Sequence, residues 1–303
     1  MRILVTGGAG FIGSHIVEYF QGKAEVRVLD NLRTGKKQNL AGFDVDFIHG
    51  SILDAPLLQR AMQGVDYVFH LAAMVSVPES VAKPGECIEV NSRGTLNVLE
   101  AAERAGVKKL SFSSSAAVYG ERKENPKRED LLPDPRSPYA VTKLSGEHLC
   151  HMFAATGRLP AVCLRYFNVY GPRQDPNSAY AAAVPAFISR ALAEKPLTIF
   201  GDGLQTRDFV FVKDIVAANV HACTAMTENG VFNVSRSQSI TINELAETIV
   251  RVTASSSPIE HAPPRPGDVR FSEGANEKIV ATGYTPSTPL DDGLRDTIRA
   301  FLP

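Results

Sequence analysis

The sequence predicts an α/β protein, built from a doubly wound parallel sheet and a smaller α/β lobe that follows it. Two observations predict this class. From Ile3 to Tyr166, short β-branched runs alternate with stretches that carry apolar residues at three- and four-residue spacing, as buried parallel strands and their covering helices do. After Tyr166 the strand pattern becomes sparse, and segments rich in Pro, Gly and Asn appear at Gly171–Asn177 and Ala262–Gly267. We therefore expect a cleft where the second lobe meets the sheet.

Six short apolar runs are the expected strands of the first lobe, and four amphipathic stretches between them are the expected helices. The strands are Ile3–Thr6, Glu25–Asp30, Val45–His49, Tyr67–Leu71, Lys109–Ser113 and Ala161–Tyr166. The helices are Ser14–Gln21, Ala55–Met62, Cys87–Ala105 and Ser137–Ala155. Two later strand-like runs, Asp208–Val212 and Phe232–Val234, are expected to return to this lobe. The first domain is thus expected to comprise residues 1–168 with 209–235, and the second lobe residues 169–208 and 236–303.

Composition and charge indicate a globular protein with no broad affinity for nucleic acid. Of the 303 residues, 44% are hydrophobic and 21% are charged, and 32 basic against 33 acidic side chains leave a net charge of −1. Such a chain is too apolar for disorder and too balanced for a nucleic-acid surface. The four cysteines form no CxxC pair, so we expect reduced thiols in a cytoplasmic protein rather than a disulfide frame or a metal site. The apolar stretch Ile3–Val17 is interrupted by glycines and is too short to span a membrane.

A glycine-rich loop connects the first expected strand to the first expected helix. Gly8, Gly10 and Gly13 satisfy the G-x-G-x-x-G pattern, in which glycines permit a tight turn, close approach to a pyrophosphate and packing of helix on strand. The unpaired N–H groups at the start of the helix favour phosphate there. Asp30 ends the second strand, 20 residues after Gly10, and a carboxylate at this point accepts hydrogen bonds from ribose hydroxyls. The spacing predicts a dinucleotide site that favours NAD, although Arg33 leaves NADP open.

Tyr139 and Lys143 are candidates for proton transfer. Ser137 can cap a helix that begins at Pro138, which places Tyr139 in the first turn and Lys143 one turn later on the same face. A phenol is a poor base at neutral pH, and a neighbouring ammonium group lowers its pKa by Coulomb attraction. A positively charged nicotinamide acts in the same direction. The alternative is a surface helix on which Lys143 only pairs with Glu147.

A run of hydroxyl groups follows the fifth expected strand. Ser113, Ser114 and Ser115 lead into the segment Ala116–Gly120, at the carboxyl edge where such sheets bind ligands. One of these hydroxyls is expected to hold the substrate oxygen that Tyr139 deprotonates. The alternative is that the run only caps backbone groups.

In their order along the chain, these motifs resemble the extended short-chain dehydrogenase/reductase family, and most closely its NAD-dependent nucleotide-sugar 4-epimerases of the UDP-glucose and UDP-N-acetylglucosamine type. The likeness covers nearly the whole chain. It rests on TGGAGFIG (6–13), DNL (30–32), HLAA (70–73), VN (90–91), SSSAAVYG (113–120), SPYAVTK (137–143), RYFNVYGPRQDPNS (165–178), TRDFVFVKD (206–214) and RPGD (265–268). This resemblance implies a Rossmann-type NAD-binding domain and a nucleotide-sugar-binding lobe.

The resemblance also implies roles for individual residues. The implied catalytic residues are Ser115, Tyr139 and Lys143. The implied NAD contacts are Gly7, Gly10, Phe11, Ile12, Asp30, Asn31, Ser51, Ile52, Leu71, Ala72, Ala73, Asn91 and Tyr166, together with Tyr139 and Lys143. The implied substrate contacts are Ser115, Asn168, Arg207, Arg265, Asp268 and Ser272. The two arginines of this set can meet a diphosphate bidentately, and no metal is implied.

Three positions depart from the wider family or separate its branches. Ala117 stands where dehydratases and decarboxylases of the family usually carry an acidic residue, which disfavours elimination chemistry. Ser51 replaces a more usual Asp beside the adenine, which leaves Ile52 to pack on the ring. Ser272 matches a position where a large aromatic residue narrows the sugar pocket in some relatives, so a small residue there leaves room for an N-acetyl group.

The function that the resemblance implies is reversible 4-epimerisation of a UDP-hexose through a 4-keto sugar, with tightly bound NAD. UDP-glucose/UDP-galactose and UDP-GlcNAc/UDP-GalNAc are the expected pairs, and UDP-glucuronate is a third. A net oxidoreductase acting on a sugar nucleotide and a non-catalytic NAD-binding protein are the alternatives. The stretches Asn91–Ala105 and Tyr139–Ala155 resemble the helices through which the family dimerises as a four-helix bundle. A homodimer is therefore expected, with no nucleic-acid or membrane partner.

Overall fold

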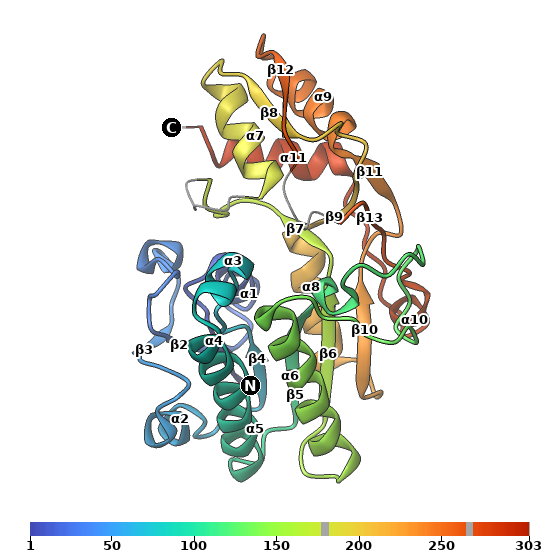
Figure 1. The fold of residues 1–303 in the computed structure, drawn as a ribbon. Coiled ribbons are helices and arrows are strands. Elements are labelled where there is room, and N and C mark those ends of the chain that lie inside the picture. The colour runs from blue at the N-terminus through green and yellow to red at the C-terminus, as the bar shows by residue number, and fades with distance from the viewer. Residues whose placement is uncertain (177–181, 265–268, 303) are drawn as a thin grey trace. The chain divides into compact units, whose positions relative to one another are not determined.

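The computed structural model describes residues 1–176, 182–264 and 269–302, and the chain divides into two compact units (Figure 1). Unit 1 comprises residues 1–120, 131–166 and 216–232. Unit 2 comprises the described residues of 121–130, 167–215 and 233–303. Within these described parts of the chain, no helix combines the length and the apolar character needed to cross a membrane.

Unit 1 is built on a parallel sheet whose strands follow the sequence pattern. The strand order is β10-β6-β5-β4-β1-β2-β3, so the chain winds outward from β1 in both directions, and the neighbouring pairs from β3 to β6 are parallel. The strands are β1 (Arg2–Thr6), β2 (Glu25–Asp30), β3 (Asp46–His49), β4 (Tyr67–His70), β5 (Lys109–Ser115), β6 (Ala161–Tyr166) and β10 (Gly230–Val234). The doubly wound class is confirmed, and the switch point where such sheets bind ligands lies between β1 and β4.

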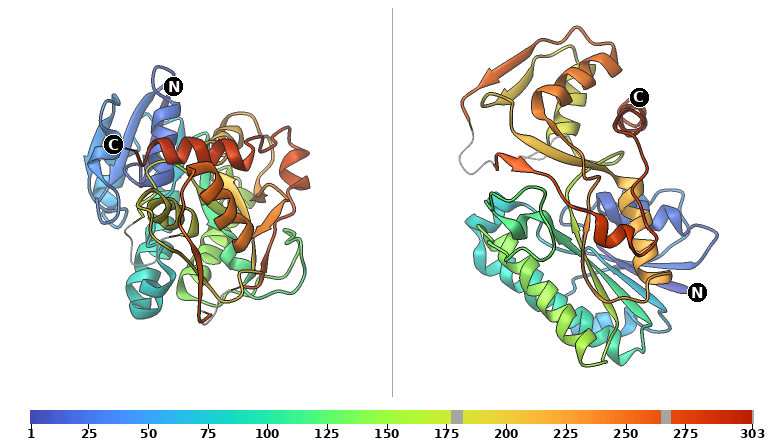
Figure 2. Two further views of the ribbon diagram at one scale, coloured as in Figure 1. Left: turned by 90° about the horizontal axis from the view of Figure 1, so that it is seen from above. Right: turned by 90° about the vertical axis from the view of Figure 1, so that its right-hand side faces the viewer.

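Helices cover both faces of this sheet, as the right-hand view of Figure 2 shows. They are α1 (Phe11–Tyr19), α2 (Ala55–Ala61), α3 (Val77–Ala82), α4 (Pro84–Ile88), α5 (Gly94–Arg104), α6 (Pro138–Ala155) and α8 (Val212–Thr224), with short 3-10 turns η1 (Lys37–Leu40) and η3 (Ala116–Tyr119). Leu4 packs in one core with α2, α5 and α6, whereas Ile3 and Val5 pack in a second core with α1 and α8. Alternate strand residues point to opposite faces, so both faces are buried. This explains why the strands are apolar throughout.

Unit 2 combines short strands with helices. Its sheets comprise β7 (Asn168–Tyr170), β9 (Thr206–Phe211), β11 (Ser239–Thr241) and β13 (Phe271–Ser272), and separately β8 (Leu197–Phe200) with β12 (Ile259–Ala262). Its helices are α7 (Ala183–Leu192), α9 (Ile242–Thr253), α10 (Glu277–Val280) and α11 (Leu290–Arg299). A capping box between Thr241 and Glu244 fixes the start of α9. Buried Asp208 accepts backbone hydrogen bonds from Arg236 (2.9 Å) and Gly274 (3.3 Å), which joins β9 to two later segments.

The second half of the chain differs from the sequence expectation in its strands. They are more numerous than the local pattern indicates, although each is short. β9 was expected to return to the first sheet, but it pairs with β7, β11 and β13, so this expectation is wrong. β10 does join the large sheet, beside β6. A strand's partner is set by packing against distant segments, and the local apolar pattern carries little information about it.

The expected long helix over residues 87–105 is interrupted. The chain forms α4, then a π-helical turn η2 (Glu89–Arg93), then α5. Asn91 lies in this turn and is buried. Such π-turns frequently occur at functional sites, and the contacts of Asn91 described below give the reason for this one.

Candidate active site

The glycine-rich loop between β1 and α1 has no space for a side chain at Gly7 or Gly13. Gly7 has a φ of +73°, and a Cβ there would lie 2.8 Å from the backbone nitrogen of Ala72. A Cβ on Gly13 would lie 2.2 Å from the carbonyl oxygen of Gly7. Gly10 is the N-cap residue of α1, and the first turn consists of the uncharged, partly buried segment Phe11–Gly13. The loop therefore brings bare backbone and the positive end of a helix to the switch point of the sheet, an arrangement that suits a pyrophosphate.

Asp30, at the end of β2, anchors this loop and retains acceptor capacity. Its Oδ2 accepts a hydrogen bond from the Ala9 N–H (2.9 Å), and its Oδ1 accepts one from the Leu32 N–H (2.7 Å). A carboxylate has about four acceptor positions, so each oxygen can take a further bond from a ribose hydroxyl. The neighbouring Asn31 is exposed, and its Oδ1 accepts from the Arg33 N–H (3.1 Å).

The Arg33 side chain is held by two carboxylates. One terminal nitrogen lies 2.7 Å from Glu79 Oε1 in α3, and the other hydrogen-bonds to Glu86 Oε1 in α4. The bond to Glu86 raises the pKa of the guanidinium and lowers the pKa of the carboxyl group. With its charge compensated, Arg33 is a weaker partner for a 2′-phosphate than the sequence suggests. The structure thus favours NAD over NADP at this position.

Other residues expected near the dinucleotide lie around the same edge of the sheet. Leu71–Ala73 follow β4 directly and are half-buried, and a Cβ on Gly7 would touch the backbone of Leu71 and Ala72. Ile52 is buried, and its Cδ1 would lie 2.5 Å from a Cβ on Gly94. Ser51 is half-buried, and its Oγ accepts a hydrogen bond from the Leu53 N–H (3.2 Å).

Asn91 uses its amide group within the protein. Its Oδ1 accepts from the Met74 N–H (2.7 Å), and its Nδ2 donates to the Met74 carbonyl (3.0 Å) and to Thr142 Oγ1 (3.0 Å). The side chain is 3% exposed. Asn91 therefore joins the segment after β4 to α6, next to Lys143, and the π-helical turn presents it for these bonds.

The three serines at the end of β5 have different partners. Ser113 Oγ hydrogen-bonds to the buried Tyr166 hydroxyl (3.0 Å). Ser114 Oγ donates to Glu147 Oε1 (2.5 Å). Ser115 is half-buried, and its Oγ accepts from the Ala117 N–H (3.2 Å) at the start of η3. Two hydroxyls of the run thus have buried partners inside the fold, and Ser115 lies at the carboxyl end of the strand.

Tyr139 and Lys143 are positioned by the start of α6. Ser137 caps the helix by accepting from the Ala140 N–H (3.2 Å), and Pro138 is its first residue. Lys143 Nζ donates to the Ser113 carbonyl (2.7 Å) and lies 5.7 Å from the centre of the Tyr139 ring. Ser115 lies close enough to the Tyr139 hydroxyl to lower the pKa of the phenol. The expected cluster of hydroxyl, phenol and ammonium groups is therefore brought together in unit 1.

The surface-helix alternative for Lys143 is wrong. Lys143 is only 4% exposed. Glu147, its suggested partner, instead forms a bidentate ion pair with Arg165 in β6 at 2.8 and 2.7 Å. Both of these side chains are almost fully buried. Because Glu147 also accepts from Ser114, the pair fixes α6 to the ends of β5 and β6.

The ion pair between Glu147 and Arg165 is not expected from the sequence pattern. Its visible signal is a charged residue, Arg165, within the otherwise apolar run Ala161–Tyr166. A buried charge requires a partner, and Glu147 lies one turn beyond Lys143 on the same helix.

Burial controls the protonation of the candidate catalytic groups. It lowers the pKa of Lys143 to about 8, so this side chain remains mostly cationic at neutral pH. Burial raises the pKa of Tyr139, against the opposing effect of Ser115. Burial and the charge of Lys143 lower the pKa of His70 in β4 to about 3, so His70 is neutral. Because burial raises the pKa of Tyr139, its side chain is a phenol at neutral pH.

Three residues expected to contact substrate lie on one sheet of unit 2. In the strand register, Ser272 of β13 pairs with Arg207 of β9, and Asn168 of β7 pairs with Phe209. Residues 207 and 209 point to the same face of β9, since side chains alternate along a strand. Asn168, Arg207 and Ser272 therefore share one face of this sheet. The remaining two expected contacts, Arg265 and Asp268, lie outside the described residues.

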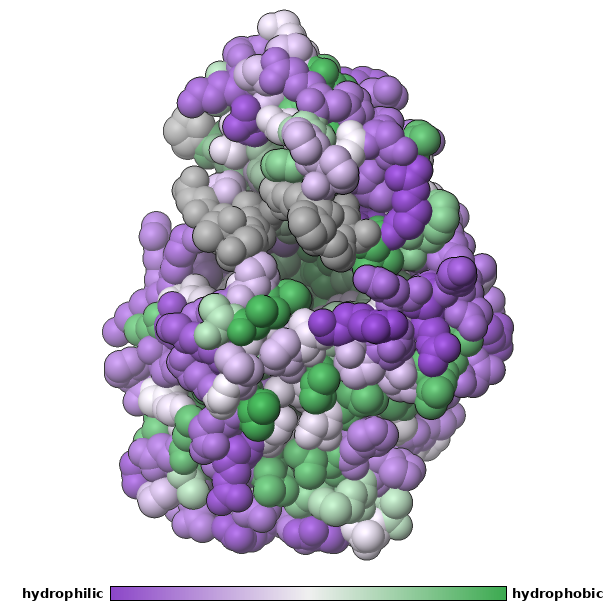
Figure 3. Space-filling model, in the orientation of Figure 1, coloured by the Kyte–Doolittle hydropathy of each residue, from purple (hydrophilic) through white to green (hydrophobic). Residues whose placement is uncertain are grey.

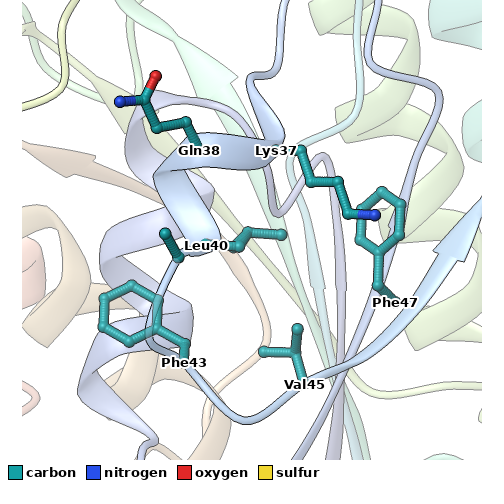
Figure 4. Close-up of a pocket in the computed structure, with 7 residues that line it drawn as sticks. Lys37, Gln38, Leu40, Phe43, Val45 and Phe47 are labelled. Carbon is teal, nitrogen blue, oxygen red and sulfur yellow. The ribbon is translucent and has the colours of Figure 1, made fainter.

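A hollow of about 480 Å³ lies between η1 and β3. In Figure 4 the side chains of Leu40, Phe43 and Val45 gather together, and the Lys37 amine lies near the Phe47 ring. The distance from Lys37 Nζ to the centre of that ring is 5.5 Å. Apart from Lys37 and Gln38 this lining is apolar, and it includes none of the residues expected to bind a cofactor or a sugar nucleotide. Among the described residues, no group of His, Cys, Asp and Glu side chains could hold a metal ion.

Known proteins are similar to this chain over most of its length. The model of the NAD dependent epimerase/dehydratase family matches residues 3–235. The structure of a UDP-N-acetylglucosamine 4-epimerase from Methanobrevibacter ruminantium, in complex with UDP-N-acetylmuramic acid, is similar with a TM-score of 0.96 and 41% sequence identity, over 99% of this chain and 97% of that one. A UDP-glucose 4-epimerase from Thermotoga maritima with UDP-glucose gives a TM-score of 0.95 and 41% identity, over 99% and 98% of the two chains.

A relative with a different activity is also similar. The UDP-N-acetyl-alpha-D-glucosaminuronate decarboxylase of Bacillus cytotoxicus is 36% identical over 316 residues, which cover 99% of this chain and 97% of the relative. Overall similarity therefore does not separate epimerisation from decarboxylation, and the separation has to come from individual residues of the site.

Proposed function

The chain belongs to the NAD-dependent epimerase/dehydratase family, and from this premise we propose that it catalyses the reversible 4-epimerisation of a UDP-hexose. The observation that carries the proposal is the cluster of Ser115, Tyr139 and Lys143 where β5 ends and α6 begins. A phenol with a hydroxyl and an ammonium group beside it can take a proton from a sugar hydroxyl and return it. Oxidation at C4 of a sugar and its reversal require this proton step.

The residues at the switch point fit NAD. Bare backbone at Gly7 and Gly13 leaves the approach that a pyrophosphate needs. The start of α1 would face the phosphates, and the remaining acceptor positions of Asp30 would meet the adenosine ribose. When bound there, NAD would supply a reversible hydride acceptor for C4 of the sugar, and it would be regenerated in each cycle.

Tyr139 would act as the base and then as the acid. Lys143 is cationic at neutral pH and favours the phenolate, while Ser115 would hold the 4-oxygen and orient it toward the phenol. Burial raises the pKa of Tyr139 and so opposes the effect of Lys143. The positive charge of an oxidised nicotinamide is expected to complete the activation, which would confine proton abstraction to the loaded enzyme.

The nucleotide part of the substrate would bind on unit 2. Arg207 provides positive charge for the diphosphate, and Asn168 and Ser272 share its face of the sheet. We assign Arg265 and Asp268 to the same ligand on the basis of the RPGD motif. A small residue at 272 would leave room for an N-acetyl group, so the proposed substrates include UDP-GlcNAc and UDP-GalNAc as well as UDP-glucose and UDP-galactose.

The residues beside Ser115 favour epimerisation over elimination or decarboxylation. Ala116 and Ala117 form the start of η3, where an acidic residue would otherwise stand in position to protonate or deprotonate the substrate. A methyl group can do neither. Retention of the 4-keto sugar until hydride returns is the chemistry that this site supports best.

We further propose that the enzyme is a cytoplasmic homodimer that pairs through α5 and α6. Exposed apolar side chains on α4 and α6 support the dimer, with Ile88, Val141 and Met152 at 51%, 48% and 41% exposure. Figure 3 shows hydrophobic residues among polar ones on the face that carries these helices. Val141 and Met152 are about three helical turns apart and so lie on one side of α6. The four buried free thiols suit a reducing compartment.

One experiment tests the reaction directly. Purified protein is incubated without added cofactor with UDP-glucose, UDP-GlcNAc or UDP-glucuronate, and the nucleotide sugars are separated by chromatography. The proposal predicts a slow approach to an equilibrium mixture of 4-epimers with no net change in absorbance of reduced nicotinamide. Release of CO₂ from the glucuronate would refute it in favour of a decarboxylase. Consumption of NAD or NADH in a parallel incubation to which either is added would refute it in favour of a net oxidoreductase. Light scattering on the same sample would refute the dimer if it gave a monomer mass.

A further inference from the structure

Ion pairs join two segments that lie on opposite sides of the switch point. Arg33 belongs to the loop after β2, whereas Glu79 in α3 and Glu86 in α4 follow β4. The strand order places β1 between β2 and β4. A contact between these segments therefore passes over the carboxyl end of β1 and the glycine-rich loop that continues from it.

The contact is a network rather than a single pair. Arg33 bonds to Glu79 at 2.7 Å and also to Glu86. Lys83, between them in sequence, lies 3.9 and 3.8 Å from the same two carboxylates. The side chains of Arg33, Glu79 and Glu86 are 31%, 34% and 42% exposed. An isolated exposed pair contributes little, but one guanidinium shared by two carboxylates can hold a defined geometry.

Both ends of the network are fixed to the rest of unit 1. On the β2 side, the Lys36 N–H and the Asn39 side chain both donate to the Ala9 carbonyl at 2.9 Å. On the β4 side, Ser80 of α3 accepts from the Tyr139 N–H at 3.2 Å. The ion pairs therefore connect two anchored segments across the carboxyl end of β1.

We propose that Arg33, Glu79 and Glu86, called the ionic tie below, close over the dinucleotide crevice and slow the release of NAD. The inference rests on the proposed function, in which NAD is regenerated in each cycle and is never exchanged as a cosubstrate. Within that function the tie has a clear use, since a cofactor that stays bound needs no rebinding between turnovers.

The test measures NAD release from the holoenzyme and does not depend on catalysis. Purified protein is denatured to determine its NAD content by chromatography, and the native protein is then washed by ultrafiltration while the released NAD is followed over time. The variants are Arg33→Gln, the double variant Glu79→Gln/Glu86→Gln, and the triple variant that combines them. Each is measured at about 50 mM and about 500 mM NaCl, because salt screens exposed charges.

A matched control removes two glutamates from comparable surface pairs elsewhere in unit 1. Glu25→Gln breaks a pair with Arg2 (2.6 Å), and Glu103→Gln breaks a pair with Arg158 (2.6 Å). Neither pair involves the segments that the tie connects. This double variant changes the net charge by the same amount as Glu79→Gln/Glu86→Gln and should release NAD at the wild-type rate.

If the ionic tie slows release, the Arg33→Gln variant and the Glu79→Gln/Glu86→Gln variant should release NAD about five- to tenfold faster than the wild type at low salt. The triple variant should be no faster than either, because residues that act through one another give non-additive effects. Wild-type release should accelerate with salt, and release from the triple variant should not. Unchanged rates, or multiplying effects in the triple variant, would overturn the tie while leaving the proposed function intact. A wild-type protein that carries no nucleotide would overturn both.

Discussion

Replacing Lys143 with methionine should make the folded protein more stable at neutral pH while lowering catalysis. Lys143 is 4% exposed, and burial lowers its pKa from 10.5 to about 8. Such a fall corresponds to roughly 3 kcal/mol of unfavourable free energy for the buried ammonium group. The methionine variant would lose the bond from Lys143 Nζ to the Ser113 carbonyl, which costs about 1–3 kcal/mol. We therefore expect a net gain of about 1 kcal/mol at neutral pH.

The stability difference between Lys143→Met and the wild type should decrease as the pH rises. The folded-state pKa lies below that of the unfolded chain, so the folded wild type binds fewer protons between about pH 8 and 10.5. The cost of burying the charge is fully present below pH 8 and is relieved as the pH rises through this range. The advantage of Lys143→Met should therefore shrink with rising pH and reverse when lysine is neutral in both states, since only the lost hydrogen bond then remains.

Urea unfolding followed by circular dichroism measures this difference at neutral pH and near pH 10. Groups whose pKa does not depend on Lys143 titrate alike in both proteins and cancel in the comparison. Cys87 does not cancel, because Lys143 lowers its pKa. Lys123→Met, at an exposed position, is the control and should change stability by less than about 0.5 kcal/mol at either pH. A Lys143→Met variant that is less stable than wild type at neutral pH, or whose difference does not change with pH, would refute the reasoning.

The remaining predictions concern catalysis and the buried ion pair. Tyr139→Phe should lower turnover by about 10²–10⁴-fold and leave UDP-sugar affinity nearly unchanged; turnover close to wild type would show that another group is the base. Ser272→Tyr should lower activity on UDP-GlcNAc by at least about tenfold relative to UDP-glucose, and equal losses on both sugars would argue against a pocket at this position. Arg165→Met should destabilise the fold by about 3–5 kcal/mol, because it leaves Glu147 buried without its partner. The double variant Glu147→Leu/Arg165→Met should recover most of that loss in urea unfolding, and a double variant as unstable as Arg165→Met would contradict the pairing.

The glycine-rich loop, Asp30 and the start of α6 could be predicted from the sequence because their signals are local. A glycine pattern between a strand and a helix, a carboxylate at a strand end and a serine before a proline each act through neighbours in the chain. The structure places these elements as expected, with Ser137 capping α6 and Asp30 bonded to the loop.

The partners of side chains could not be predicted in the same way. Arg33 left NADP open in the sequence, and only the crossing from β2 to α3 and α4 brings it to Glu79 and Glu86. The three serines were equivalent until β6 and α6 supplied partners for Ser113 and Ser114. Glu147 was a candidate partner for Lys143, yet Arg165 from the neighbouring strand takes that place.

The sequence alone determined the doubly wound sheet, the dinucleotide loop and the set of chemical groups, because local conformational preference and apolar period specify elements and their ends. Tertiary structure decided which groups meet. It assigned β9 to unit 2 against expectation, buried Lys143 deeply enough to lower its pKa, and joined Arg33 to segments that follow β4. These outcomes depend on strand order and burial, which arise from contacts between residues far apart in the chain and leave no local pattern.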